Sequence, residues 1–169
     1  MAAMHAVALP EALAVTGMPR GKIKATIERL NAAGTVSRGN YGGHNSPPVT
    51  ARDIARYIFG MSALRVAHAA TFANTIGALP IYCGDGPPTA EAAAVAIIEG
   101  AAFLRPSIVD LDGELIIGIT RPGIVVKSGP SIWQYRPVEM PLAAAEFTFN
   151  IKLPVVAEIA RRLLIEQRN

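Results

Sequence analysis

The feature that most constrains the fold is the segment Leu13–Val36, in which two helical patterns are separated by a tight turn. Gly17 can adopt a positive φ and end the first helix. Pro19 suits the first turn of the second helix, because its missing N–H would have no partner there. The apolar residues of the second helix recur at helical spacing: Met18, Ile23, Ile27 and Leu30. The segment therefore predicts two packed helices joined by a short turn.

The second predicted helix, Pro19–Ala33, has small and basic residues opposite its apolar stripe. These residues are Arg20, Gly21, Lys22, Lys24, Ala25 and Arg29. Small side chains allow a helix to approach another surface closely, and Arg and Lys reach phosphates or guanine edges. The positive end of the helix dipole also favours a phosphate. We therefore expect this helix to enter the major groove of duplex DNA; the alternative is an ordinary helical hairpin with a solvated basic face.

At these residues the chain resembles the DNA-binding domain of winged helix-turn-helix bacterial regulators, especially the GntR type. In that family one helix ends in Leu-Ala-x-x-x-Gly, and the reading helix runs through Arg-Gly-x-Val to an Arg-Leu pair and an Ala-Gly stop. The matching residues are Leu13, Ala14, Gly17, Arg20, Gly21, Ile23, Arg29, Leu30, Ala33 and Gly34. Pro19 stands where the family usually has a Ser cap. Over about residues 9–45, the resemblance implies a winged helix-turn-helix that binds double-stranded DNA as a homodimer.

The stretch Thr35–Pro48 follows the reading helix, where a wing belongs in such a domain. It is rich in turn-forming residues that tolerate a positive φ, and it contains polar side chains suited to phosphate or minor-groove contacts. The expected DNA contacts in it are Arg38, Tyr41, His44 and Asn45. The alternative is a plain loop that makes no contacts.

A long helix is predicted next, from Thr50 to about Ile76 with a kink at Gly60. It begins with the spacing of a capping box, in which Asp replaces the usual Glu. Arg52 and Arg56 lie one turn apart, so they either flank the DNA backbone or form a solvated face. The expectation for His68, which lies among apolar residues further along, is a hydrogen-bonded core or interface histidine.

The second half of the chain predicts a small α+β unit. Leu79–Pro88 is predicted to be a linker or long turn, with Cys83 as a small apolar filler. An Ala-rich helix should follow over Thr89–Leu104, and Asp112-Gly113 predicts the turn of a hairpin. The further β-rich runs are Ile124–Lys127, Ile132–Arg136 and Phe147–Ile151, and Pro154 opens a last amphipathic helix.

The predicted fold class is therefore α+β: an N-terminal winged helix-turn-helix, a long helix, and a small C-terminal antiparallel sheet with a terminal helix. Residues 1–79 are expected to form the DNA-binding domain with its following helix. Residues 80–169 are expected to form an oligomerisation or partner-binding domain.

Charge is unevenly distributed. Residues 18–65 contain eight Lys or Arg side chains and two carboxylates, a net charge of +6, whereas the whole chain carries only +3. A basic part joined to a slightly acidic remainder is typical of a nucleic-acid-binding module. No apolar run has the length and quality of a membrane span, and the start of the chain does not resemble a signal peptide, so a cytoplasmic protein is expected.

Catalysis finds little support in this sequence. No Ser-His-acid, Cys-His or metal-hydrolase pattern is present, and no Gly-rich strand-to-helix turn suggests a cofactor. Asp110, Asp112 and Glu114 alternate around the predicted hairpin turn, but solubilising turn residues are the favoured interpretation over a metal site. We therefore expect neither an enzyme nor a bound metal or cofactor.

The leading functional hypothesis is a sequence-specific transcriptional regulator. The chain also bears a general likeness to small DNA-binding proteins of alphaproteobacterial prophages, which favours a phage or prophage origin. One alternative is a DNA-packaging recognition subunit of the small terminase type. The other is a protein-interaction module whose basic helix touches no DNA.

Overall fold

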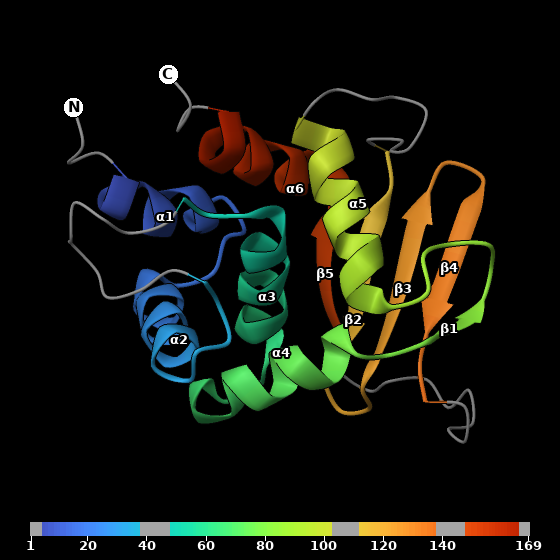
Figure 1. Ribbon diagram of the computed structural model, residues 1–169, viewed down its shortest axis with the longest axis horizontal. Coiled ribbons are helices and arrows are strands. Elements are labelled where there is room, and N and C mark those ends of the chain that lie inside the picture. The colour runs from blue at the N-terminus through green and yellow to red at the C-terminus, as the bar shows by residue number, and fades with distance from the viewer. Residues whose placement is uncertain (1–4, 38–47, 103–111, 138–147, 166–169) are drawn as a thin grey trace.

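The computed structural model describes residues 5–37, 48–102, 112–137 and 148–165, and it shows an α+β protein (Figure 1). A helical N-terminal half lies beside an antiparallel sheet that helices cover on one face. In chain order the elements are α1 (His5–Ala14), α2 (Arg20–Ala32), α3 (Ala51–Ser62), the 3-10 helix η2 (Val66–His68), α4 (Ala69–Gly77), β1 (Ile81–Cys83), α5 (Ala90–Ala102), β2 (Glu114–Gly118), β3 (Gly123–Ser128), β4 (Ser131–Tyr135), β5 (Thr148–Lys152), α6 (Leu153–Ala160) and the π-helical turn η3 (Arg161–Ile165). The predicted α+β class is thus confirmed.

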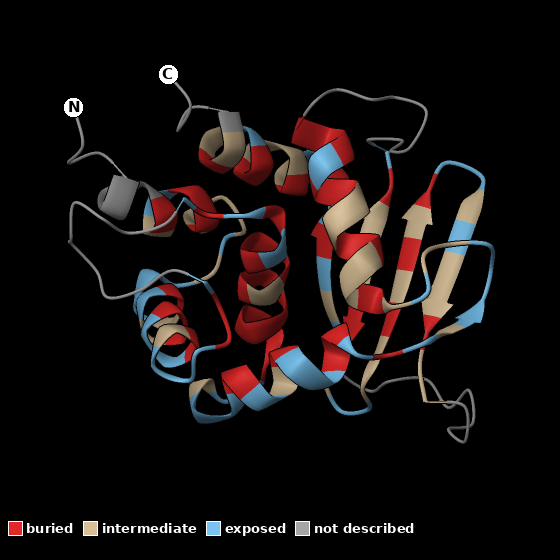
Figure 2. Cartoon of the chain, viewed as in Figure 1, coloured by how far each residue is buried: buried red, intermediate tan, exposed pale blue. Residues whose placement is uncertain are grey.

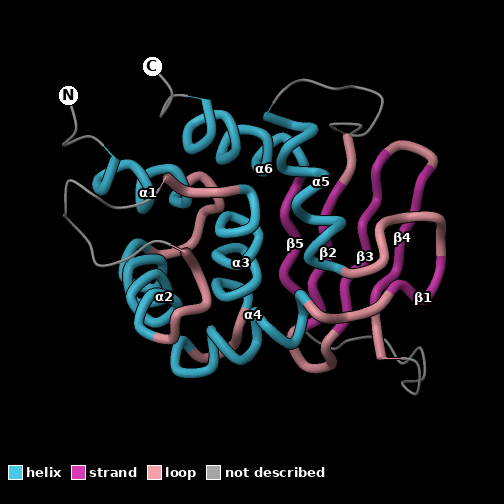
Figure 3. The backbone as a smooth tube through the Cα atoms, viewed as in Figure 1, coloured by secondary structure: helices cyan, strands magenta, loops and turns pink. Residues whose placement is uncertain are grey.

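The sheet has the strand order β1-β4-β3-β2-β5, and every neighbouring pair is antiparallel (Figure 3). Leu115 lies opposite Val126 on one side and Ile151 on the other, and all three side chains are buried. Along β3, buried side chains alternate with half-buried ones, as expected of a sheet that is covered on one face. The strands predicted at 124–127, 132–136 and 147–151 are confirmed to within one residue.

Two predictions for the second half are wrong. Residues 81–83 form the edge strand β1 rather than a linker, and Cys83 is exposed rather than a core filler. β2 pairs with β3 on one side and with β5 on the other. The first strand of the hairpin predicted around the Asp112-Gly113 turn, residues 108–111, lies outside the described residues.

The prediction of one long helix from Thr50 to about Ile76 is also wrong, because α3 ends at Ser62 and α4 begins only at Ala69. Gly60 lies buried inside α3, two residues before its end. A Cβ at Gly60 would lie 2.9 Å from Leu30 Cδ1 and 3.2 Å from Thr26 Cγ2, so the glycine allows α3 to pack closely on α2. His68, predicted to be in a core or interface, is exposed at the end of η2.

The start of the helical half differs from the prediction in one further respect. α1 begins at His5, so Pro10 lies inside the helix rather than at its start. The capping box at Thr50 and Asp53 is confirmed, with both reciprocal hydrogen bonds present. Thr89 accepts a hydrogen bond from Ala92 N at 3.2 Å and caps α5 as predicted.

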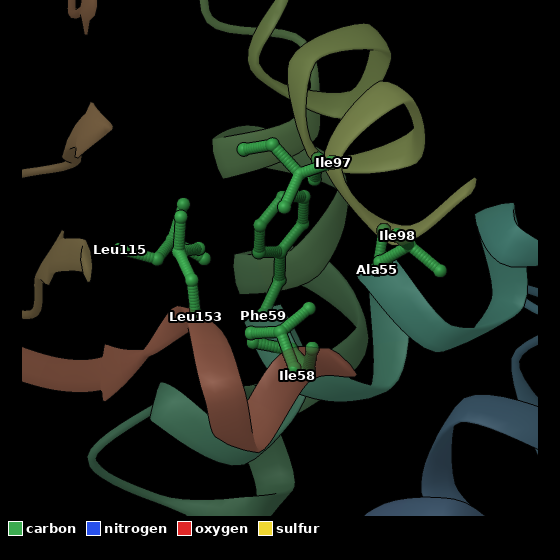
Figure 4. Close-up of a pocket in the computed structure, with 9 residues that line it drawn as sticks. Ala55, Ile58, Phe59, Ile97, Ile98, Leu115 and Leu153 are labelled. Carbon is green, nitrogen blue, oxygen red and sulfur yellow. The ribbon is translucent and has the colours of Figure 1, made fainter. Parts of the chain in front are cut away.

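Among the described residues, one cluster of buried apolar side chains extends from the helical half to the sheet and α6. It leaves a small cavity between α3, α5, β2 and α6, whose lining side chains are drawn in Figure 4. The lining is entirely apolar: Ala55, Ile58, Phe59, Ala94, Ile97, Ile98, Leu115, Leu153 and Val156. A small cavity without polar groups stays dry, so we regard it as a packing gap rather than a ligand site. The domain division at residue 79 stays a prediction.

Thr26 presents a buried hydroxyl with no hydrogen-bond partner in the described structure. Valine has nearly the same shape and lacks the polar group, so Thr26→Val should raise the free energy of unfolding by about 1 kcal/mol. Urea denaturation checks this. Thr26→Ser is the matched control: it keeps the hydroxyl, removes the methyl group beside Gly60, and should be destabilising. Lower stability for the valine variant would show that the hydroxyl has a partner.

Candidate nucleic-acid interface

The turn between α1 and α2 places the basic helix at the edge of the helical half (Figure 1). Gly17 has φ +77°, and the Thr16 hydroxyl donates to Leu13 O at 2.7 Å, which closes the end of α1. The residue before α2 is Pro19, which supplies no side-chain hydrogen bond to the first turn. The first backbone N–H groups of α2 are therefore not capped by that side chain, which leaves the positive end of its dipole open to an anion.

The other end of α2 is closed by backbone hydrogen bonds. Gly34 has φ +63°, Gly34 N donates to Asn31 O at 3.0 Å, and Thr35 N donates to Leu30 O at 3.0 Å. This is the Schellman arrangement, which a glycine in the left-handed region makes possible. The helix therefore begins and ends close to the residues that the sequence predicted.

One face of α2 is buried and the opposite face is exposed, as Figure 2 shows. Ile23, Thr26, Ile27 and Leu30 are buried. At helical spacing, Gly21, Ala25, Glu28 and Ala32 then follow one another along the middle of the outer face. Arg20 and Lys24 lie along one side of this row, and Lys22 and Arg29 lie along the other. The outer face thus has mostly small side chains along its middle and basic side chains along both borders.

The cations of α2 differ from most others in having no carboxylate partner within the described part of the chain. Among the described residues, the Lys and Arg side chains that form ion pairs are Arg52 and Arg56 with Glu91, Lys127 and Lys152 with Glu114, and Arg161 and Arg162 with Glu158. Six cations make no ion pair or side-chain hydrogen bond with any residue in that part of the chain: Arg20, Lys22, Lys24, Arg29, Arg65 and Arg121. Unpaired cations are therefore concentrated on α2.

Lys22 is the least exposed of these cations. Its partial burial lowers the pKa of its ammonium group from the ordinary lysine value, because burial disfavours the charged form. A nearby anion would reverse that effect by stabilising the charge. The position therefore gains more from an anionic partner than a fully solvated lysine would.

Arg52 and Arg56 were predicted to flank DNA, and the structure places them in a different setting. Each donates through Nε to Glu91 at 2.7 Å, and Arg56 also donates to the carbonyl of Thr35. The Arg56 side chain is only 19% exposed, whereas that of Arg52 is 61% exposed. Arg56 therefore joins α3 to α5 and to the chain after α2, and little of its charge remains for a ligand.

The predicted wing lies outside the described residues, together with Arg38, Tyr41, His44 and Asn45. The described structure identifies neither a helix-turn-helix nor a wing as such. Of the predicted site residues, it brings together Arg20, Gly21, Lys22, Lys24 and Arg29 on α2.

Other kinds of site find no support in the described ranges. They contain no cluster of three His, Cys, Asp or Glu side chains that could hold a metal ion. Asp110 lies outside those ranges, and Glu114 is held by Lys127 and Lys152. No helix within them is both long and apolar enough to cross a membrane.

No protein-family model, curated protein or solved structure matches this chain. Its function is therefore inferred from its own residues and their arrangement.

Proposed function

We propose that this protein binds double-stranded DNA through the outer face of α2 and acts as a transcriptional regulator. The observation that carries the proposal is the set of unpaired cations on this helix. Cations elsewhere in the described chain mostly have carboxylate partners, whereas Arg20, Lys24 and Arg29 are exposed without one. Such a surface is complementary to the phosphate backbone.

In this proposal α2 enters the major groove. The small residues Gly21 and Ala25 let its backbone approach the base edges, while the two basic borders reach phosphates on either side of the groove. Glu28 is the single carboxylate of the outer face and can accept a hydrogen bond from a cytosine amino group. The protein acts as a homodimer, because binding two half-sites increases specificity. Residues 35–48 supply the wing of the domain, and the protein acts in the cytoplasm.

The direct test is the double variant Arg20→Ala/Lys24→Ala. It should weaken binding to the protein's preferred duplex at least tenfold near 0.1 M salt, since two phosphate contacts are lost. The slope of log K against log salt should become shallower by about 1.8. Fluorescence anisotropy with a labelled duplex, selected from a random-sequence pool, gives both quantities.

The matched control is Lys127→Ala/Lys152→Ala, which removes the same charge from the sheet. Both lysines lie at the surface, where an ion pair contributes little to stability, so the control should fold and bind DNA as the parent does. Equal binding by the parent and the α2 variant would overturn the proposal and favour a protein-interaction module. Light scattering of the DNA-free protein separates a regulator dimer from the ring expected of a packaging subunit.

A further inference from the structure

The short segment Leu64–His68, between α3 and α4, is largely exposed to solvent, and it includes a large apolar side chain. Leu64 is 77% exposed, and Arg65, Ala67 and His68 are also exposed. Arg65 makes no ion pair or side-chain hydrogen bond with any residue that the structure describes. The sequence placed this segment inside a long helix, and so it gave no reason to single out Arg65.

The way α3 crosses α2 determines where this segment lies. Tyr57 Oη is 3.5 Å from Asn31 Oδ1, whereas Gly60, one turn later, packs against Thr26 and Leu30. α3 therefore crosses α2 from the Asn31 side toward the Thr26 side. Continued in that direction, the chain after α3 runs toward the Thr26 side, and η2, which follows it, contacts α2.

The same side of α2 carries one of its basic borders. Lys22 and Arg29 are four residues before and three residues after Thr26, so all three share that side of the helix. Between Ile54 and Gly84 the chain contains no acidic residue. Arg65 thus adds a cation beside the Lys22 and Arg29 border without a neighbouring carboxylate from its own part of the chain.

We propose that the Leu64–His68 segment is a second DNA-contacting element, in which Arg65 binds a backbone phosphate beside those that Lys22 and Arg29 contact. His68 supplies a further N–H donor toward the same strand. This inference rests on the proposed function of α2 and extends it, since phosphate contacts outside the groove fix the orientation of the reading helix.

The test compares Arg65→Ala with Arg121→Ala in the full-length protein. Arg121 is also exposed and unpaired within the described residues, but it lies in the turn between β2 and β3. Arg65→Ala should weaken duplex binding about fivefold and make the salt slope shallower by about 0.9, the value for one lost contact. Arg121→Ala should change neither, and Arg65→Lys should restore most of the affinity.

The outcomes separate this inference from the proposed function. Equal effects of Arg65→Ala and Arg121→Ala would show that only net charge matters at these positions, and the second element would be rejected. Weak binding by Arg20→Ala/Lys24→Ala alone would reject the second element and leave α2 as the DNA-binding helix. Unchanged binding by every one of these variants would reject both.

Discussion

Replacing Gly113 with alanine should lower the free energy of unfolding by about 4 kcal/mol or prevent folding altogether. A Cβ at this position would lie 1.9 Å from Lys127 O and 2.7 Å from Leu153 Cδ1. The first of these atoms belongs to the backbone of β3 and cannot move without disturbing the sheet. Gly113 O also accepts a hydrogen bond from Leu153 N at 3.0 Å, so the displacement would reach the start of α6.

Gly123→Ala is the matched control for this prediction, because its Cβ would lie 3.6 Å from Tyr135 O, an ordinary contact distance. Urea denaturation followed by circular dichroism should show the control near the parent and the Gly113 variant far below it. A Gly113→Ala protein as stable as Gly123→Ala would show that β2 and β3 do not approach as closely as the structure indicates.

Replacing Asp53 with asparagine should lower the free energy of unfolding by about 3 kcal/mol at neutral pH. Asp53 is 2% exposed, and its carboxylate accepts four hydrogen bonds. Two come from Ser37, from N at 2.8 Å and from Oγ at 2.5 Å, and two come from Thr50, from N at 3.0 Å and from Oγ1 at 2.8 Å. Asparagine would replace one accepting oxygen with an NH₂ group that faces donors.

The same substitution should change how stability depends on pH. Burial raises the pKa of Asp53, but the hydrogen bonds from Ser37 and Thr50 outweigh it, and the net pKa is lowered. The carboxylate therefore stabilises the fold fully above the unfolded-state pKa of about 3.9, and this stabilisation is lost as the pH falls through the lower folded-state pKa. Parent and Asp53→Asn should differ most at neutral pH and converge in acid.

Chemical denaturation between neutral and acidic pH measures this convergence. Glu11→Gln, which neutralises an exposed carboxylate without a partner among the described residues, is the control and should leave stability close to that of the parent. A constant difference between parent and Asp53→Asn down to the lowest pH would indicate that the ionised form of Asp53 is not what holds Ser37 to α3.

The sequence by itself determined the elements whose causes are local. The bounds of α2 follow from Pro19, the apolar spacing and Gly34, and the capping box of α3 follows from Thr50 and Asp53. Caps, glycine turns and apolar periodicity act within a few residues, so they can be recognised without knowing the rest of the fold. For the same reason the exposed and buried faces of α2 were predictable from one helix alone.

Only the tertiary structure decided which side chains meet across the chain. Arg56 and Glu91 are far apart in sequence, so nothing local showed that the charge of Arg56 is already paired. Gly60 was predicted to kink its helix. The residues that it contacts, Thr26 and Leu30, belong to another helix, so the local sequence could not show that it serves close packing. The end of α3 at Ser62, and with it the exposure of Arg65, likewise depends on how the helices pack. Contacts between distant segments set these features, and local propensity does not specify them.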